Sequence, residues 1–192
     1  MCSRILRVAA FWLVLTPVLC EATTVDFYTD GTIEEGAAFD YVNVWDAAAV
    51  DMSGGFVDQL TLNESSTFNL YDGEISVAHL LDASTMTIYG GEIVTDVGVF
   101  GNAVANLYGG IYSYYVAASE SGSIHIFGYD FELTQSGSSY FLSGFWADGT
   151  AFTDIYLRGP DTYPRVTLHV IPEPSAMFLL LAGFGLMRKT RR

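Results

Sequence analysis

A short motif recurs five times in the middle of the chain at an almost constant interval. Each copy alternates apolar and polar residues and then reaches a turn that contains glycine. Successive copies start 18, 18, 19 and 19 residues apart, and weaker strand patterns such as DQLTLNES and TDVGVFGNA lie between them. A constant period of this length indicates a repeat architecture. The copies are VDMSGGFV from Val50, FNLYDGEI from Phe68, MTIYGGEI from Met86, ANLYGGIY from Ala105 and IHIFGYDF from Ile124.

A unit of this size cannot bury its own apolar face, so successive units must stack and share one core. The repeat therefore predicts an all-β fold, a small single-stranded β-solenoid (parallel β-helix) with coils of 18–19 residues. The composition agrees, because the residues that favour strands are abundant between the two ends of the chain. An antiparallel β-sandwich, with Asp-Gly and Gly-Gly as hairpin turns, is the alternative. The equal spacing and the similarity of the copies, column by column, favour the solenoid.

The alternation within the motif assigns its residues to faces. Two columns point inward and are apolar, one outward column is polar, and a second outward column is mostly aromatic. The inward pairs are Val50 and Met52, Phe68 and Leu70, Met86 and Ile88, Ala105 and Leu107, and Ile124 and Ile126. The polar column is Asp51, Asn69, Thr87, Asn106 and His125, and the aromatic column is Ser53, Tyr71, Tyr89, Tyr108 and Phe127.

The aromatic column places Tyr71, Tyr89 and Tyr108 at equivalent positions of consecutive coils. One interpretation is structural, because stacked aromatic side chains stabilise neighbouring strands. The other is an adhesive ladder, in which rings at strand spacing, about 4.8 Å, present flat faces to a sugar or to another protein. The sequence alone leaves both interpretations open.

The repeats occupy residues 41–133, and the chain on either side is expected to cap them. Residues 134–171 predict a C-terminal β cap of two or three strands, in which Trp146 covers the open end of the solenoid. Residues 23–40 are expected to cap the other end. Caps are needed because an uncovered strand edge can pair with another chain.

The first 22 residues have the order of a secretory signal peptide. Arg4 and Arg7 form the basic start, 8–19 is apolar, and small residues precede the expected cleavage site after Ala22. A buried N-terminal helix and a lipoprotein signal at Cys20 are the alternatives. The residues before Cys20 lack the small residue that lipidation normally requires.

Residues 172–192 contain three parts in a fixed order. The tripeptide Pro172-Glu173-Pro174 comes first, and its two prolines keep it extended and accessible. The apolar segment 175–187 is shorter than the about 20 residues that span a bilayer, so it predicts a marginal transmembrane helix. A basic cluster over 188–192 keeps the tail in the cytoplasm. Its basic residues are Arg188, Lys189, Arg191 and Arg192.

This tripartite end resembles the PEP-CTERM sorting signal of Gram-negative bacteria, apart from Thr190, which interrupts the basic cluster. The resemblance implies recognition by an exosortase, a membrane cysteine transpeptidase, and export linked to extracellular polysaccharide and biofilm. The Gly-Gly motifs at 54–55, 90–91 and 109–110 also resemble the strand-loop-strand repeats of autotransporter-like surface proteins.

The charge of the chain limits its partners. The net charge is −14, and of the eight Lys and Arg residues only Arg158 and Arg165 lie between the two end segments. Such an acidic body repels nucleic acid. Both cysteines, Cys2 and Cys20, lie in the predicted signal peptide, so the mature chain has no disulfide and no thiol nucleophile.

No familiar catalytic motif is present, although solenoids also carry polysaccharide lyases and hydrolases. Glycoside hydrolysis needs two carboxylates about 5–10 Å apart, but the acids of this chain are scattered and its histidines lie on separate elements. We therefore expect no catalytic, cofactor-binding or metal-binding residue. The acids considered are Asp72, Glu74, Asp82, Glu92, Asp96, Asp130 and Glu132, and the histidines are His79, His125 and His169.

These features predict an exported, non-enzymatic structural or adhesive protein that an exosortase sorts to the cell surface or extracellular matrix. Its expected partners are signal peptidase and the exosortase during processing, the inner membrane before processing, and afterwards extracellular polysaccharide or a second copy. A carbohydrate-active enzyme on the same scaffold, a polysaccharide lyase or hydrolase, is the alternative. Two or more acids that meet Arg158 or Arg165 in one groove would favour the enzyme, whereas a flat exposed face would favour the structural protein.

Overall fold

The computed structural model describes residues 23–173, and these residues form fourteen β-strands and a single short 3-10 helix, with no α-helix. The prediction of an all-β fold is confirmed. The strands are β1 (Thr24–Phe27), β2 (Gly31–Ile33), β3 (Ala38–Val44), β4 (Ala49–Leu62), β5 (Thr67–Leu80), β6 (Thr85–Ile88), β7 (Glu92–Val99), β8 (Val104–Leu107), β9 (Ile111–Tyr112), β10 (Tyr115–Ala118), β11 (Ser123–Ser136), β12 (Ser139–Trp146), β13 (Ala151–Leu157) and β14 (Val166–Val170), and the 3-10 helix is Tyr163–Arg165.

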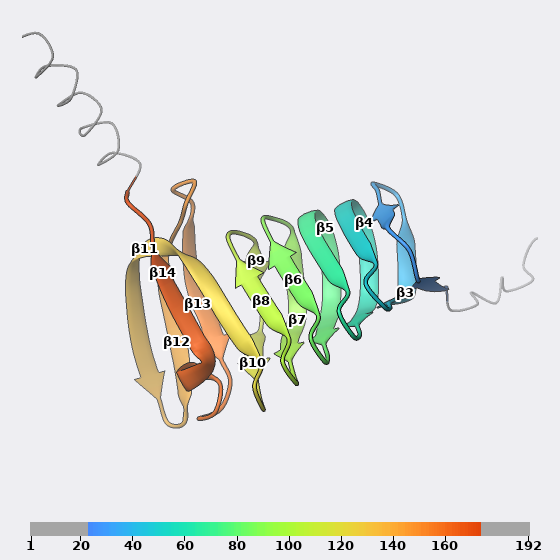
Figure 1. Cartoon of the computed structure of the whole chain (residues 1–192). Coiled ribbons are helices and arrows are strands. Elements are labelled where there is room, and N and C mark those ends of the chain that lie inside the picture. The colour runs from blue at the N-terminus through green and yellow to red at the C-terminus, as the bar shows by residue number, and fades with distance from the viewer. Residues whose placement is uncertain (1–22, 174–192) are drawn as a thin grey trace, which may run out of the picture.

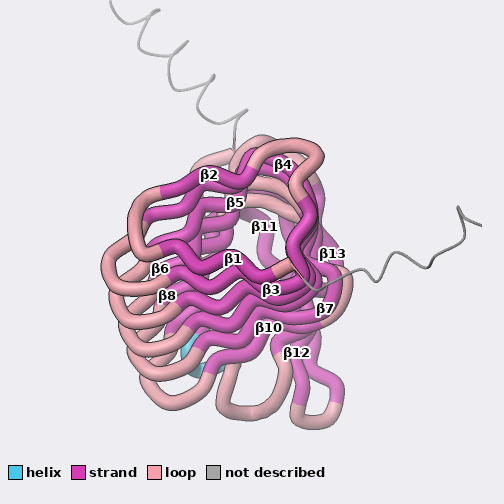
Figure 2. The backbone as a smooth tube through the Cα atoms, turned by 90° about the vertical axis from the view of Figure 1, so that its right-hand side faces the viewer, coloured by secondary structure: helices cyan, strands magenta, loops and turns pink. Residues whose placement is uncertain are grey.

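The strands stack as successive rungs along one axis (Figure 1). A view turned by 90° shows the chain winding around a central region, with the turns of successive coils lying over one another (Figure 2). The stacked parallel strands resemble a β-solenoid of about five turns. This parallel pairing is incompatible with the antiparallel sandwich, so that alternative is wrong.

The register of the rungs follows the sequence motif residue for residue. Val50 pairs with Phe68, Phe68 with Met86, Met86 with Ala105, and Ala105 with Ile124. The period read from the sequence is therefore the distance along the chain between stacked residues. A parallel register of this kind is strongly specified, because a slip by one residue would turn every inward side chain to solvent.

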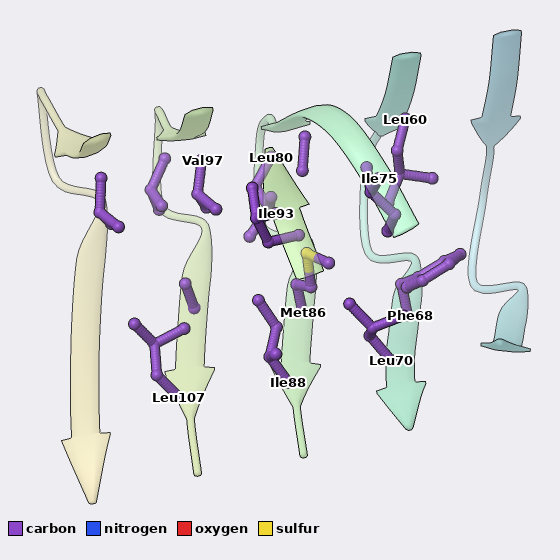
Figure 3. Packing of buried hydrophobic residues seen from close by; sticks show 14 of the residues in the cluster. Leu60, Phe68, Leu70, Ile75, Leu80, Met86, Ile88, Ile93, Val97 and Leu107 are labelled. Carbon is purple, nitrogen blue, oxygen red and sulfur yellow. The ribbon is translucent and has the colours of Figure 1, made fainter. Parts of the chain in front are cut away.

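The inward columns form the core of the stack. Phe68, Leu70, Met86 and Ile88 have no solvent-exposed surface. They converge with Leu60, Ile75, Leu80, Ile93 and Val97, which come from the second strand segment of each coil (Figure 3). The weak strand patterns between the motif copies thus supply the opposite wall of the core.

The glycines of the motif form one corner of each coil. Gly110 has φ +93°, a conformation that residues with a side chain rarely adopt. The equivalent glycines in earlier coils also have positive φ. The opposite corner has no comparable signal in the sequence. It places Glu64 and Asp82 at positive φ, and the Asp82 carboxylate accepts a hydrogen bond of 3.0 Å from the Glu64 N–H.

The N-terminal segment extends the stack as well as ending it. β1 pairs in parallel with β3, and β2 pairs in parallel with β4. Gly31 and Ile33 of β2 lie in the inward columns, beside Val50 and Met52. Residues 23–40 therefore supply one further layer of the parallel stack.

The C-terminal segment differs in one respect from the two or three cap strands that the sequence predicts. The strands β11, β12 and β13 form an antiparallel meander, in which Trp146 is buried against the core. β14 is different, because it returns to the stack and pairs in parallel with β11, with Val166 opposite Ile124. Its sequence, VTLHV, lacks the glycine turn by which the other rungs could be recognised.

The predicted signal peptide (1–22), Pro174, the predicted transmembrane helix (175–187) and the basic cluster (188–192) lie outside the described residues. Between residues 23 and 173, no helix is long and apolar enough to span a membrane.

Candidate functional site

The aromatic column forms a continuous stack of rings on the outside of the coils. Ring centroids are 5.1 Å apart between Tyr71 and Tyr89, 5.5 Å between Tyr89 and Tyr108, and 4.1 Å between Tyr108 and Phe127. The ring of His169 on β14 continues the stack at 4.3 Å from Phe127. The in-register rungs impose this arrangement, because equivalent side chains of neighbouring coils are a strand spacing apart.

The ladder differs from the expectation that flat ring faces point to solvent. Adjacent rings are inclined by 4° to 16°, so each inner ring has both faces covered by its neighbours. Solvent reaches the ring edges and hydroxyls, and Tyr71, Tyr89 and Tyr108 are 48%, 49% and 36% exposed. Desolvation, the Asp51 carboxylate and Tyr89 raise the pKa of Tyr71. The ladder therefore offers solvent a row of phenol edges.

The predicted sorting tripeptide begins two residues after Val170, the last residue of β14. The backbone N–H of Ile171 donates a hydrogen bond of 2.8 Å to the carbonyl oxygen of Gly128. Pro172 and Glu173 follow without regular structure, and both are exposed. The first two residues of the predicted motif thus lie at the surface, next to the end of β14.

A groove of about 780 Å³ lies between the glycine corner of the coils and the turn that joins β12 to β13. We call it the corner groove. Three of the acids considered from the sequence line it, together with Asp148 on the turn. The three acids are Asp72, Glu74 and Glu92.

A second groove, of about 400 Å³, lies beside β10 and the loop that follows β13. We call it the arginine groove, because Arg158 lies there with its guanidinium 4.6 Å from the centre of the Tyr115 ring. His79 and Asp96 also line it, with 3.6 Å between His79 Nε2 and a carboxylate oxygen of Asp96. Asp161 is the second acid of this groove.

The loop that carries Arg158 is fastened to the stack by a buried threonine. The Thr162 hydroxyl donates a hydrogen bond of 2.5 Å to the Arg158 carbonyl and accepts one of 3.2 Å from the Ala118 N–H. Arg158 makes no ion pair within residues 23–173, although the body is strongly acidic. The groove therefore holds an arginine that contacts the Tyr115 ring and forms no ion pair among the described residues.

The other acids and histidines considered from the sequence line neither groove. Asp130 and Glu132 lie on the far half of β11, and Asp82 is engaged at the corner described above. His125 and His169 come together, with 3.0 Å between ring nitrogens, because β14 is in register with β11. Desolvation, together with His169, lowers the pKa of His125.

The second body arginine lines neither the corner groove nor the arginine groove. Arg165 lies in the 3-10 helix, and its Nε is buried without a hydrogen-bond partner among the described residues. Within residues 23–173, no cluster of three or more His, Cys, Asp or Glu side chains could hold a metal ion.

No protein-family model matches this chain, and neither a curated protein nor a solved structure matches it. The functional assignment therefore depends on the residues and grooves of the chain itself.

Proposed function

We propose that the chain is an exported, non-enzymatic structural or adhesive protein, delivered by an exosortase to the cell surface or matrix. The position of the tripeptide carries this proposal. Pro172 and Glu173 are exposed directly after β14, so a processing enzyme can reach the motif without disturbing the body. In this proposal, the body is a capped parallel β-helix that a signal peptide exports and a C-terminal helix holds in the inner membrane until processing.

Replacement of Glu173 by Ala tests the sorting step. We expect the precursor to accumulate unprocessed in the inner membrane, because a recognition enzyme loses the only charged group of the tripeptide. The measurement is fractionation of cells followed by detection of precursor and mature forms. Glu34→Ala, at an exposed acid in the first coil, is the matched control and should be processed normally. Normal release of the Glu173→Ala chain would identify the tripeptide as a spacer.

The phenol edges of the ladder are the proposed adhesive surface. Replacing Tyr71, Tyr89 and Tyr108 together by Phe keeps the stacked rings but removes the exposed hydroxyls. We expect this variant to melt within a few degrees of the wild-type chain and to be lost from the polysaccharide matrix, since the hydroxyls supply the hydrogen bonds to sugar or protein. Thermal denaturation and matrix retention are the two measurements.

A triple Ser variant at the same positions provides the comparison, because it removes the three rings and therefore their stacking. It should lose stability by about 1–3 kcal/mol. If the triple Phe variant is retained in the matrix like the wild-type chain, the ladder stabilises the coils and has no adhesive role.

The carbohydrate-active enzyme is the second candidate, and the arginine groove is the observation that favours it. Asp96, Asp161, Arg158 and His79 line one groove, and these are residue types that a lyase or hydrolase uses. A fall in the viscosity of the matrix polysaccharide on addition of the wild-type chain would select this candidate over the non-enzymatic protein.

A further inference from the structure

The corner groove exists because one rung of the stack is missing. β9 pairs with β7, and among the described strands no other strand covers its outer edge. On the adjacent wall, β13 continues the stack above β10. β11 instead leaves the stack after its first half and pairs with β12, so the place above β9 remains open to solvent.

The walls of the corner groove combine apolar and hydrogen-bonding surfaces. In one wall, Glu74, Glu92 and Ile111 stand in register on consecutive rungs. Ile111 is 62% exposed, although it continues a strand of the core sheet. The turn between β12 and β13 provides Asp148 and Thr150 on the opposite wall, and Thr150 is fixed by a 2.8 Å hydrogen bond from its N–H to the Asp148 carboxylate.

Glycine backbone forms part of the floor of the groove. Gly90 and Gly109 lie so close to the preceding coil that a Cβ atom at either would overlap a tyrosine carbonyl oxygen. The glycines required by the stacking therefore leave their part of the floor without side chains, and Tyr89, Trp146 and Phe152 also line the groove. A flat, extended ligand can approach such a floor closely.

The charge of the groove selects against anions. Its lining includes Asp72, Glu74, Glu92 and Asp148 but no Lys, Arg or His, and none of the four carboxylates forms an ion pair within residues 23–173. The Glu92 carboxylate accepts one hydrogen bond, of 2.8 Å, from the Ser113 hydroxyl, which leaves acceptor positions free. The groove repels uronates, sulfates and phosphates, and it attracts ammonium groups.

We propose that the corner groove binds a segment of a polysaccharide that carries free amino groups. Sugar hydroxyls and ammonium groups would meet the carboxylates of both walls, and the apolar face of a sugar ring would lie against Ile111. The volume of about 780 Å³ is in the range of ligand sites. This inference rests on the proposed association with extracellular polysaccharide, and it names the class of polymer.

The test compares two oligosaccharides of equal length, one of glucosamine and one of N-acetylglucosamine. The measurement is titration calorimetry with the full chain. It is made at about pH 6, which is above the ordinary pKa of a carboxyl group. We expect the amino form to bind at least about tenfold more tightly than the acetylated form, and its binding to weaken as salt is added. Equal affinity for the two oligosaccharides would overturn the proposal, as would tighter binding of an oligouronate.

The matched variants change two charges each. Glu74→Gln with Asp148→Asn removes one acid from each wall, and we expect about a tenfold loss of affinity for the amino oligosaccharide. Glu34→Gln with Asp46→Asn removes two exposed acids outside the groove and should bind like the wild-type chain. The proposal is wrong if both double variants bind alike.

Two further measurements distinguish recognition of a sugar from attraction between charges. The outcome is also independent of the sorting proposal. Ile111→Ser should weaken binding of the amino oligosaccharide, and an oligolysine that binds as tightly as the sugar would overturn the assignment to a polysaccharide. The binding experiment does not depend on processing at Glu173. If the groove fails to bind the sugar, the sorting proposal is unaffected. If the Glu173→Ala chain is released normally, the proposal that the groove binds a polysaccharide is unaffected.

Discussion

Replacing Leu70 or Ile88 by Asp is expected to unfold the body, whereas Thr87→Asp is expected to leave it folded. Leu70 and Ile88 have no exposed surface, and each stands between apolar neighbours of the coils above and below. A carboxylate at either position would be desolvated without a partner, at a cost of about 4 kcal/mol or more. This is a large part of the stability of a typical domain, about 5–15 kcal/mol.

Thr87 is the matched control because it is one residue away on the same strand and points outward. Its neighbours in the column are Asn69 and Asn106, so an added carboxylate meets amide groups and water. Chemical denaturation of the three variants, followed by circular dichroism, measures the difference. Similar midpoints for all three would contradict the assignment of inward and outward columns.

The period and the faces of the repeat could be predicted because each depends only on the local sequence. Alternation assigns the faces, and the constant spacing assigns the register, so the sequence alone is enough to place Val50, Phe68 and Met86 in one column. The stacking of the tyrosine rings is implied only in part by that register. The register brings the rings to neighbouring rungs, but only the structure shows that they turn their faces to one another and not to solvent.

The ends of the stack could not be predicted in the same way. β14 lacks the motif, and its place beside β11 depends on the position in space at which the preceding β11–β13 meander ends. The two grooves arise from this irregular end. The arginine groove joins His79 and Asp96 of the coils to Arg158 of the loop after β13, and no local pattern connects residues so far apart in sequence.

The predicted sorting signal is a different case, because the prediction depends on a resemblance. Its recognition depends on the order of Pro172-Glu173-Pro174, the apolar segment and the basic cluster, and not on the fold of the body. The structure adds that Pro172 and Glu173 are exposed next to the end of β14. The body and the signal can therefore be tested by separate experiments.

Replacement of Gly109 by Ala is expected to destabilise the stack more than most single substitutions. Gly109 is buried, and an added Cβ would lie less than 3.0 Å from the Tyr89 carbonyl oxygen of the preceding coil. The rungs cannot separate to make room, because the Tyr108 N–H donates a 2.8 Å hydrogen bond to Ile88 and the Ile111 N–H one of 2.9 Å to Gly91. We expect a loss of about 3 kcal/mol or more in the free energy of unfolding.

Gly36→Ala separates this steric effect from backbone strain. Gly36 has φ +86° but open space around it, so alanine there meets only the conformational cost of about 1 kcal/mol. Gly109, in contrast, has no positive φ, and its requirement for glycine comes entirely from the close approach of the next coil. Denaturation midpoints should therefore fall much further for Gly109→Ala than for Gly36→Ala. The reverse order would mean that the coils can move apart at this corner, and that the backbone floor of the corner groove is not fixed by the stacking.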